Sequence, residues 1–310
     1  MDRGSSAPLA AIVGPTASGK SDLALALARR TPLEILVADS RQVYRGMDVG
    51  TAKPDAAARA RVPHHLLDLV APDEPFSVAE WVAAARALIP LVAARERLPL
   101  LVGGSGLYIS ALVDGYDLDS MPPASALRQE LDRELADRGI GPLATRLAAK
   151  DPATAARIDL RNPRRVIRAL ERNGQASEPN RPWVGQLVMI GLRRPLELLD
   201  RRINARAARL FSSGLLDEVA ALLASGYGAS LTPMTGHGYR EAAHVLAGDS
   251  SVEEAIASTA LHTRQYARRQ QTWFKRDHRI RWIDAGDLPA DAPAVVDQVQ
   301  AALRSAQRDG

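Results

Sequence analysis

The chain has 310 residues, of which 46% are hydrophobic, and its 40 Lys and Arg residues against 36 Asp and Glu give a formal net charge of +4. This length suits one large α/β unit with an accessory part, and the absence of cysteine excludes disulfides and thiolate metal sites. Arg, Asp, Gly or Pro interrupts every long apolar run, and residues 1–6 lack the apolar segment of a secretory signal. We therefore predict a cytoplasmic protein without a membrane span.

The first predicted elements surround a phosphate-binding pattern. An apolar strand at residues 8–13 and a helix-forming stretch at 22–29 flank the G-x-x-x-x-G-K-[ST] segment Gly14-Pro15-Thr16-Ala17-Ser18-Gly19-Lys20-Ser21. Its glycines allow backbone N–H groups to surround an anion, Lys20 adds a full charge, and Ser21 offers a hydroxyl to a phosphate oxygen or to Mg²⁺. The pattern predicts a di- or triphosphate site. The alternative is a Gly-rich turn without a ligand.

Two more strands are predicted before residue 103. An apolar run at 33–38 ends at Asp39-Ser40, a helix follows at about 78–95, and a strand at 98–102 leads into Gly103-Gly104-Ser105-Gly106. Ligands of open α/β sheets collect beyond the carboxyl ends of the strands. We therefore expect the phosphate-binding loop, Asp39 and the Gly103 turn to meet in one crevice.

The pattern becomes helical after residue 113. We predict a helical, highly charged insertion at 114–185, which includes the Pro- and Asn-containing stretch 177–182, and a strand that returns to the sheet at 186–192. Most of the remaining chain is predicted to be helical, at 196–213, 215–224, 239–246 and 252–275. The fold class is thus α/β, a parallel sheet flanked by helices, with a core of residues 1–113 and 186–310 and an all-helical insertion domain.

Asp39 is the one carboxylate that ends a strand near the phosphate loop, because the strand at 98–102 ends in glycines where NTPases usually place an Asp for Mg²⁺. The hydrogen-bonding side chains from Ser40 to Tyr44 follow it and suit recognition of a nucleobase edge. Asp39 is therefore a candidate general base. The alternative is a helix N-cap, which the Asp-Ser pair also suits.

Arginine is concentrated in two segments. One holds Arg264, Arg268, Arg269, Lys275, Arg276, Arg279 and Arg281, and the other holds Arg157, Arg161, Arg164, Arg165, Arg168 and Arg172. Clusters of one sign indicate a polyanionic partner, while the alternative is a solvated helix face.

Taken together, the motifs resemble the bacterial tRNA dimethylallyltransferases, in order and over nearly the whole chain. The phosphate loop is the first match. The others are Asp39-Ser40-Arg41-Gln42-Val43-Tyr44, Gly50-Thr51-Ala52-Lys53-Pro54, Gly103-Gly104-Ser105-Gly106-Leu107-Tyr108, Arg164-Arg165-Val166-Ile167-Arg168-Ala169-Leu170-Glu171, Gly238-Tyr239-Arg240-Glu241 and residues 263–274.

The resemblance implies a P-loop NTPase-like fold and transfer of a dimethylallyl group from dimethylallyl diphosphate to N6 of the adenosine 3′ of the anticodon in tRNA. It implies that Gly14 to Ser21 and Arg206 hold the diphosphate, with Arg202 as a possible companion, that Ser21 helps hold Mg²⁺, and that Lys20, Ser21 and Asp39 are catalytic. Asp39 would take the N6 proton of a base that has left its stack.

The same resemblance implies contacts with the anticodon stem-loop of tRNA, and we expect a monomer. The implied residues are Asp39, Ser40, Arg41, Gln42, Ser105, Arg128, Arg164, Arg165, Val166, Ile167, Arg168, Gly238, Tyr239, Arg240, Arg268, Arg269, Gln270, Trp273 and Lys275.

Three alternatives are open on the sequence alone. An adenylate isopentenyltransferase would use the same loop and base on free AMP or ATP, but it has little use for two basic segments. A small-molecule P-loop kinase is disfavoured by the missing strand-terminal Asp. An RNA-binding module with a degenerate loop is disfavoured by the intact Lys20 and Ser21.

Overall fold

The computed structural model describes residues 7–116, 118, 126–172 and 181–308 and divides the chain into two units. Unit 1 comprises Met1–Tyr116 and Arg181–Gly310, and unit 2 comprises Asp117–Asn180. The predicted stretch 177–182 lies outside the described residues up to residue 180.

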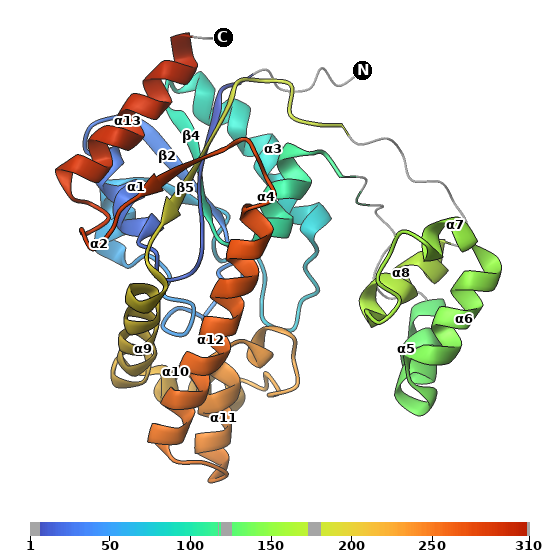
Figure 1. Cartoon of the computed structure of the whole chain (residues 1–310). Coiled ribbons are helices and arrows are strands. Elements are labelled where there is room, and N and C mark those ends of the chain that lie inside the picture. The colour runs from blue at the N-terminus through green and yellow to red at the C-terminus, as the bar shows by residue number, and fades with distance from the viewer. Residues whose placement is uncertain (1–6, 117, 119–125, 173–180, 309–310) are drawn as a thin grey trace. The chain divides into compact units, whose positions relative to one another are not determined.

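Unit 1 is built on a parallel sheet, which confirms the predicted α/β class (Figure 1). Six strands are described, in the order β3-β2-β4-β1-β5-β6, and every neighbouring pair is parallel. The central strands are nearly continuous apolar runs because helices cover both faces. The strands are β1 (Leu9–Val13), β2 (Leu33–Ala38), β3 (His64–His65), β4 (Leu98–Gly103), β5 (Leu187–Arg193) and β6 (Ile280–Asp284).

The helices of unit 1 form the layers around this sheet. They are α1 (Lys20–Ala28), α2 (Ala56–Arg61), α3 (Val78–Ala94), α4 (Gly106–Val113), α9 (Leu196–Ser212), α10 (Leu215–Ala224), the 3₁₀ turn η1 (Pro233–Thr235), α11 (Tyr239–Ala247), α12 (Val252–Phe274) and α13 (Pro293–Arg308). Leu23 of α1 and Val299 of α13 belong to one core cluster with the strands, whereas Trp81 of α3 donates to the Val37 carbonyl at 3.2 Å. Helices α9 to α12 gather beyond one end of the sheet (Figure 1).

The predicted strands omit β3 and β6, and the predicted helices omit α2, α4 and α13. Strand β6 is an edge strand in which exposed and buried residues mix, so it lacks the continuous apolar run that revealed β1 and β2. Strand β3 has two residues, which is too short for any periodicity.

Every regular element in the described part of unit 2 is a helix, as predicted. Its core is formed by Leu131, Leu143, Leu147, Val166 and Ile167, all of which are almost fully buried. The helices are α5 (Ala126–Arg138), α6 (Ile140–Lys150), α7 (Pro152–Ala155) and α8 (Pro163–Arg172). Among the described residues of the chain, no helix has the length and apolar character needed to cross a membrane.

Glu34 is the charged exception inside the sheet. Its side chain, at the second position of the otherwise apolar strand β2, is 4% exposed, and its carboxylate accepts two hydrogen bonds from Arg95, at 2.9 and 2.6 Å. The His65 ring lies 2.7 Å from the same carboxylate. The Arg95 hydrogen bonds lower the pKa of Glu34 and outweigh the opposing effect of burial.

We expect Glu34→Gln to lower the free energy of unfolding by about 2 kcal/mol at neutral pH, since it removes the charge from a buried hydrogen-bonded group. Because folding lowers the pKa of Glu34, the difference in unfolding free energy has its full size at pH values above the ordinary pKa of a carboxyl group. It shrinks at lower pH, where acid protonates the wild-type carboxylate. Urea unfolding of both proteins at neutral and acid pH measures it. Equal stabilities at neutral pH would contradict the prediction.

Candidate active site at the carboxyl ends of the strands

The predicted phosphate-binding loop connects β1 to α1 in a backbone conformation that glycine favours. Gly14 has a φ of 141° and Gly19 a φ of 98°. A Cβ at Gly19 would also lie 2.5 Å from the Ala290 Cβ, so space requires glycine there too. Helix α1 begins at Lys20, and its free N–H groups carry partial positive charge at the loop. This geometry suits an anion.

Two arginines from other parts of the chain hold the outer side of the loop. Arg194 donates from Nε to the Ser18 carbonyl at 2.6 Å, and Arg202 donates from Nε to the Ala17 carbonyl at 2.8 Å. These two hydrogen bonds occupy carbonyls of the loop and so help to fix its backbone conformation. The sequence analysis missed Arg194, although its place just after the predicted strand 186–192 was a usable signal.

Arg194 also links the loop to the C-terminal part of the chain. Its Nη1 donates to the carbonyls of Gly286 and Leu288, at 2.9 and 2.8 Å, in the turn between β6 and α13. The Arg194 side chain is buried, and its Nη2 has no hydrogen-bond partner among the described residues. Burial lowers the pKa of this guanidinium, with a further contribution from Arg202.

Lys20 and Arg206 bring two positive charges into the same space. Burial, the larger cause, and the Arg206 charge together lower the pKa of Lys20 to about 7, against the opposing effect of the Asp39 carboxylate. Burial likewise lowers the pKa of Arg206. Lys20 Nζ donates to the Pro15 carbonyl at 2.6 Å, which is a neutral acceptor. Lys20 and Arg206 therefore bring together more positive charge than the Asp39 carboxylate balances.

Asp39 follows β2 and lies in a turn. Its Oδ1 accepts the Arg41 backbone N–H at 2.8 Å, while no donor to Oδ2 is found among the described residues. The next helix along the chain is α2, which begins at Ala56. The alternative interpretation of Asp39 as a helix N-cap is therefore wrong.

A cavity of about 1450 Å³ joins these groups. As expected from the strand ends, it is lined by the phosphate loop, Asp39 and the Gly103 turn, and by side chains from α9 and α12. The side chains around it include those of Lys20, Ser21, Asp39, Gln42, Arg202 and Arg206.

Helix α12 contributes Gln270 and Tyr266 to the lining of the cavity. Gln270, predicted as a tRNA contact, is 6% exposed; its Oε1 accepts the Thr16 N–H at 2.8 Å and its Nε2 donates to the Gly104 carbonyl at 2.9 Å. A Cβ at Gly104 would lie 2.1 Å from that Nε2, so the close approach requires glycine. Tyr266 lines the cavity one helical turn earlier. It was not predicted, although its i, i+4 spacing from Gln270 places both on one helix face.

The other residues predicted around the target base differ in exposure. Ser105 is buried, and its hydroxyl accepts the Ser40 N–H at 3.0 Å. Gln42 lines the cavity, and Arg41 donates to the Thr232 carbonyl. Of the four residues from Asp39 to Gln42, Asp39 and Gln42 line the cavity.

The predicted tRNA contacts of α11 and α12 fall into two groups. Gly238 and Tyr239 are buried, and the Tyr239 hydroxyl donates to Glu218 at 2.6 Å. The exposed group consists of Arg240, Arg268, Arg269, Trp273 and Lys275. Contact of tRNA with either group stays a prediction, and the buried side chains have a structural role of their own.

The predicted contacts of unit 2 divide in the same way. Val166 and Ile167 belong to its core. Arg128 and Arg168 lie 3.2 and 3.7 Å from the buried Glu171 carboxylate, so both arginines form ion pairs within unit 2. Arg164 and Arg165 are exposed on α8.

Among the described residues, no three His, Cys, Asp or Glu side chains come together to form a metal site. At diphosphate sites Mg²⁺ is commonly held in part by oxygens of the bound diphosphate. Ser21, which lines the cavity at the start of α1, is the hydroxyl suited to join them.

Comparisons with known proteins agree with one another. A model of the family described as IPP transferase matches residues 42–277, and one described as isopentenyl transferase matches residues 7–62. A tRNA dimethylallyltransferase of Roseiflexus sp. is 46% identical over 299 residues, which cover 94% of this chain and 98% of the relative.

Solved structures give the same result. A tRNA isopentenylpyrophosphate transferase from Bacillus halodurans is 37% identical, with a TM-score of 0.72 and coverage of 97% of this chain and 98% of that chain. A eukaryotic dimethylallyltransferase acting on tRNA has a TM-score of 0.82, with coverage of 97% of this chain and 80% of that chain, but its 23% identity shows the fold alone. With the relative of 46% identity and a family model over most of the sequence, the chain belongs to the tRNA dimethylallyltransferase family, a family of transferases.

Proposed function

We propose that this protein transfers the dimethylallyl group of dimethylallyl diphosphate to N6 of the adenosine 3′ of the anticodon in tRNA and releases diphosphate. The observation that carries the proposal is the shared cavity, in which the cationic cradle of Lys20 and Arg206 faces the carboxylate of Asp39. A cradle for a leaving anion and a base for an incoming nucleophile are the two groups that this reaction requires.

The donor half of the reaction depends on charge. The loop N–H groups, Lys20 and Arg206 bind the diphosphate and stabilise the negative charge that grows on it as the allylic C–O bond breaks. The electron pair of that bond leaves with the diphosphate. We propose that Ser21 and the diphosphate oxygens hold Mg²⁺, which supplies further charge neutralisation when bound.

The acceptor half depends on Asp39. The adenine N6 forms a bond to the allylic carbon, and its proton passes to Asp39, so that bonds and charges balance. Since Oδ1 is engaged by the Arg41 N–H, Oδ2 is the oxygen that takes the proton. The target base must leave its stack to reach the cavity, and the exposed arginines of α8 and α12 are the proposed tRNA contacts.

Because the proposed substrate is tRNA, we also propose the cytoplasm as the compartment, and a monomer remains our prediction for the oligomeric state. One assay tests the function: labelled dimethylallyl diphosphate or ATP is offered with tRNA, with AMP or without an acceptor. We expect label on tRNA alone. Label on AMP would indicate an adenylate isopentenyltransferase, phosphate transfer from ATP a kinase, and no transfer a binding protein.

Asp39→Asn should reduce single-turnover transfer by about 10²–10⁴-fold while both substrates still bind, because the amide keeps the shape but cannot accept the proton. Rapid-quench kinetics with saturating donor measures the loss. Asp73→Asn, in an exposed turn, is the matched control and should change nothing. A near wild-type rate for Asp39→Asn would show that Asp39 is not the base.

Lys20→Ala should lower kcat/KM for the donor by about 10²-fold, because it removes one preorganised charge from the leaving group. Since the pKa of Lys20 is about 7 in the free protein, wild-type kcat/KM for the donor should fall as pH rises above this value, as the ammonium loses its proton. Initial rates between neutral and alkaline pH measure both effects. If the variant keeps the wild-type profile, Lys20 does not hold the diphosphate.

Arg164→Ala with Arg165→Ala should raise KM for tRNA and flatten the log–log salt dependence of tRNA binding by about 1.5, since each lost phosphate contact removes a little under one unit of slope. Donor binding and melting temperature should not change, because both side chains are exposed. Arg168→Ala is the contrasting variant and should melt earlier, since Arg168 lies beside Glu171. An unchanged salt slope in the double variant would refute the tRNA contact.

A further inference from the structure

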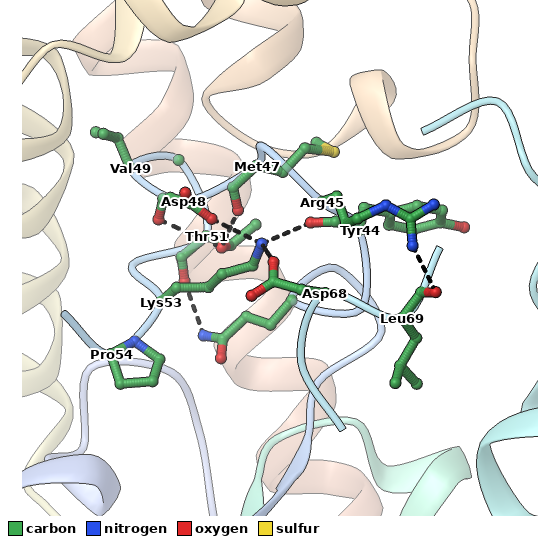
Figure 2. Close-up of polar contacts among 12 residues, drawn as sticks. Tyr44, Arg45, Met47, Asp48, Val49, Thr51, Lys53, Pro54, Asp68 and Leu69 are labelled. Carbon is green, nitrogen blue, oxygen red and sulfur yellow. Dashed lines mark hydrogen bonds and ion pairs between the residues drawn. The ribbon is translucent and has the colours of Figure 1, made fainter. Parts of the chain in front are cut away.

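The Gly50 to Pro54 motif has no role in the proposed chemistry, yet it contains a buried lysine. The Lys53 side chain is 1% exposed, and its ammonium lies 2.7 Å from Asp48 and 2.5 Å from Asp68 (Figure 2). It also donates to the Tyr44 carbonyl at 2.5 Å. These three acceptors engage all three ammonium donors, so Lys53 itself cannot bind a substrate.

The backbone on both sides of this ion pair is strained. Ala52, directly before Lys53, has a φ of 50°, and Asp68, its partner, has a φ of 55°. Residues with a Cβ rarely adopt this left-handed conformation, and they keep it only where the surroundings hold them. The Lys53–Asp68 pair joins the two strained points and is therefore suited to hold both.

A second anchor holds the same segment from the other side. The Glu218 carboxylate of α10 accepts the N–H groups of Asp48, Val49 and Gly50, at 2.8, 2.7 and 3.1 Å. It also accepts the Tyr239 hydroxyl at 2.6 Å. Residues 47–54 are thus fixed at their start by Glu218 and at their end by Lys53.

Between the two anchors lies the Thr51 carbonyl, which touches both halves of the active site. It accepts a hydrogen bond from Gln42 Nε2 at 3.1 Å and one from Arg206 Nη2 at 3.3 Å. Gln42 lies in the cavity beside the proposed base, whereas Arg206 belongs to the diphosphate cradle. The direction of one carbonyl therefore affects an acceptor-side residue and a donor-side residue together.

We propose that Lys53 is a positioning residue for the transfer reaction: by holding residues 47–54, it aims the Thr51 carbonyl so that Gln42 and Arg206 keep their places in the cavity. The inference rests on the proposed function for its kinetic consequence. Its structural consequence, weaker anion binding when the segment moves, needs no turnover.

The test compares three variants of the full chain. Lys53→Met keeps the aliphatic stem and removes the ammonium. Asp48→Asn is the milder variant, because the Asp48 side chain is 59% exposed and its replacement leaves no buried charge without a partner. Glu34→Gln is the matched control, since it weakens a buried ion pair at a residue that does not line the cavity. Melting temperature, KM for the donor and kcat on tRNA are measured for each, together with calorimetric binding of inorganic diphosphate.

We expect Lys53→Met to raise KM for the donor and lower kcat by about tenfold each, because small displacements of substrate-positioning groups reduce rates strongly. Asp48→Asn should shift both constants in the same direction by a few-fold, and Glu34→Gln should melt earlier with both constants unchanged. Diphosphate binding should weaken in Lys53→Met even if the wild type proves inactive on tRNA, which separates this inference from the proposed function. The inference would be overturned if a folded Lys53→Met keeps the wild-type kinetic constants and diphosphate affinity. If Lys53→Met does not fold, the same result in Asp48→Asn would overturn it. Kinetic shifts of equal size in Glu34→Gln would also overturn it.

Discussion

Positive charge at the carboxyl ends of the strands is the constraint on which the rest of the structure depends. Lys20 and Arg206 line a cavity in which Asp39 is the carboxylate that opposes them, and burial lowers the pKa of each cation. Without an anion, such an arrangement opposes folding, since buried charges need partners. Burial of the hydrophobic core around the sheet offsets the cost of bringing these charges together. A bound diphosphate would supply the missing negative charge.

The shape of the phosphate loop is set by segments far away in the sequence. Arg194, after β5, and Arg202, in α9, occupy its outer carbonyls, while Gln270 of α12 binds the Thr16 N–H. Arg194 in turn contacts the turn before α13. The loop motif is therefore a short stretch of sequence whose conformation depends on distant residues, which belong to the part of unit 1 that follows unit 2 in the chain.

The sequence predicted the elements whose signal is local and strong. The loop motif and the continuous apolar runs identified β1, β2, β4 and β5, and the strand-end rule brought Asp39 and Gly103 to the loop. Strand β6 escaped because an edge strand has no such run. The family resemblance identified Gln270 and Tyr239 as candidate site residues, but it did not reveal that their side chains are buried. A motif match does not say which way a side chain faces. The Thr51 carbonyl was missed because long-range hydrogen bonds leave no periodic trace in the sequence, whereas the place of Arg194 after a predicted strand was a signal that could have been used.

The most direct test of the account is the titration of Lys20 itself. The chain has four lysines, so ¹³C labelling at the lysine ε-carbon gives few NMR signals, and Lys20→Arg assigns the one that matters. We predict a pKa of about 7 in the free protein and a marked rise when inorganic diphosphate is added, because the ligand supplies the missing negative charge. A Lys20 that titrates near 10.5 in the free protein, or whose pKa does not respond to diphosphate, would contradict the account.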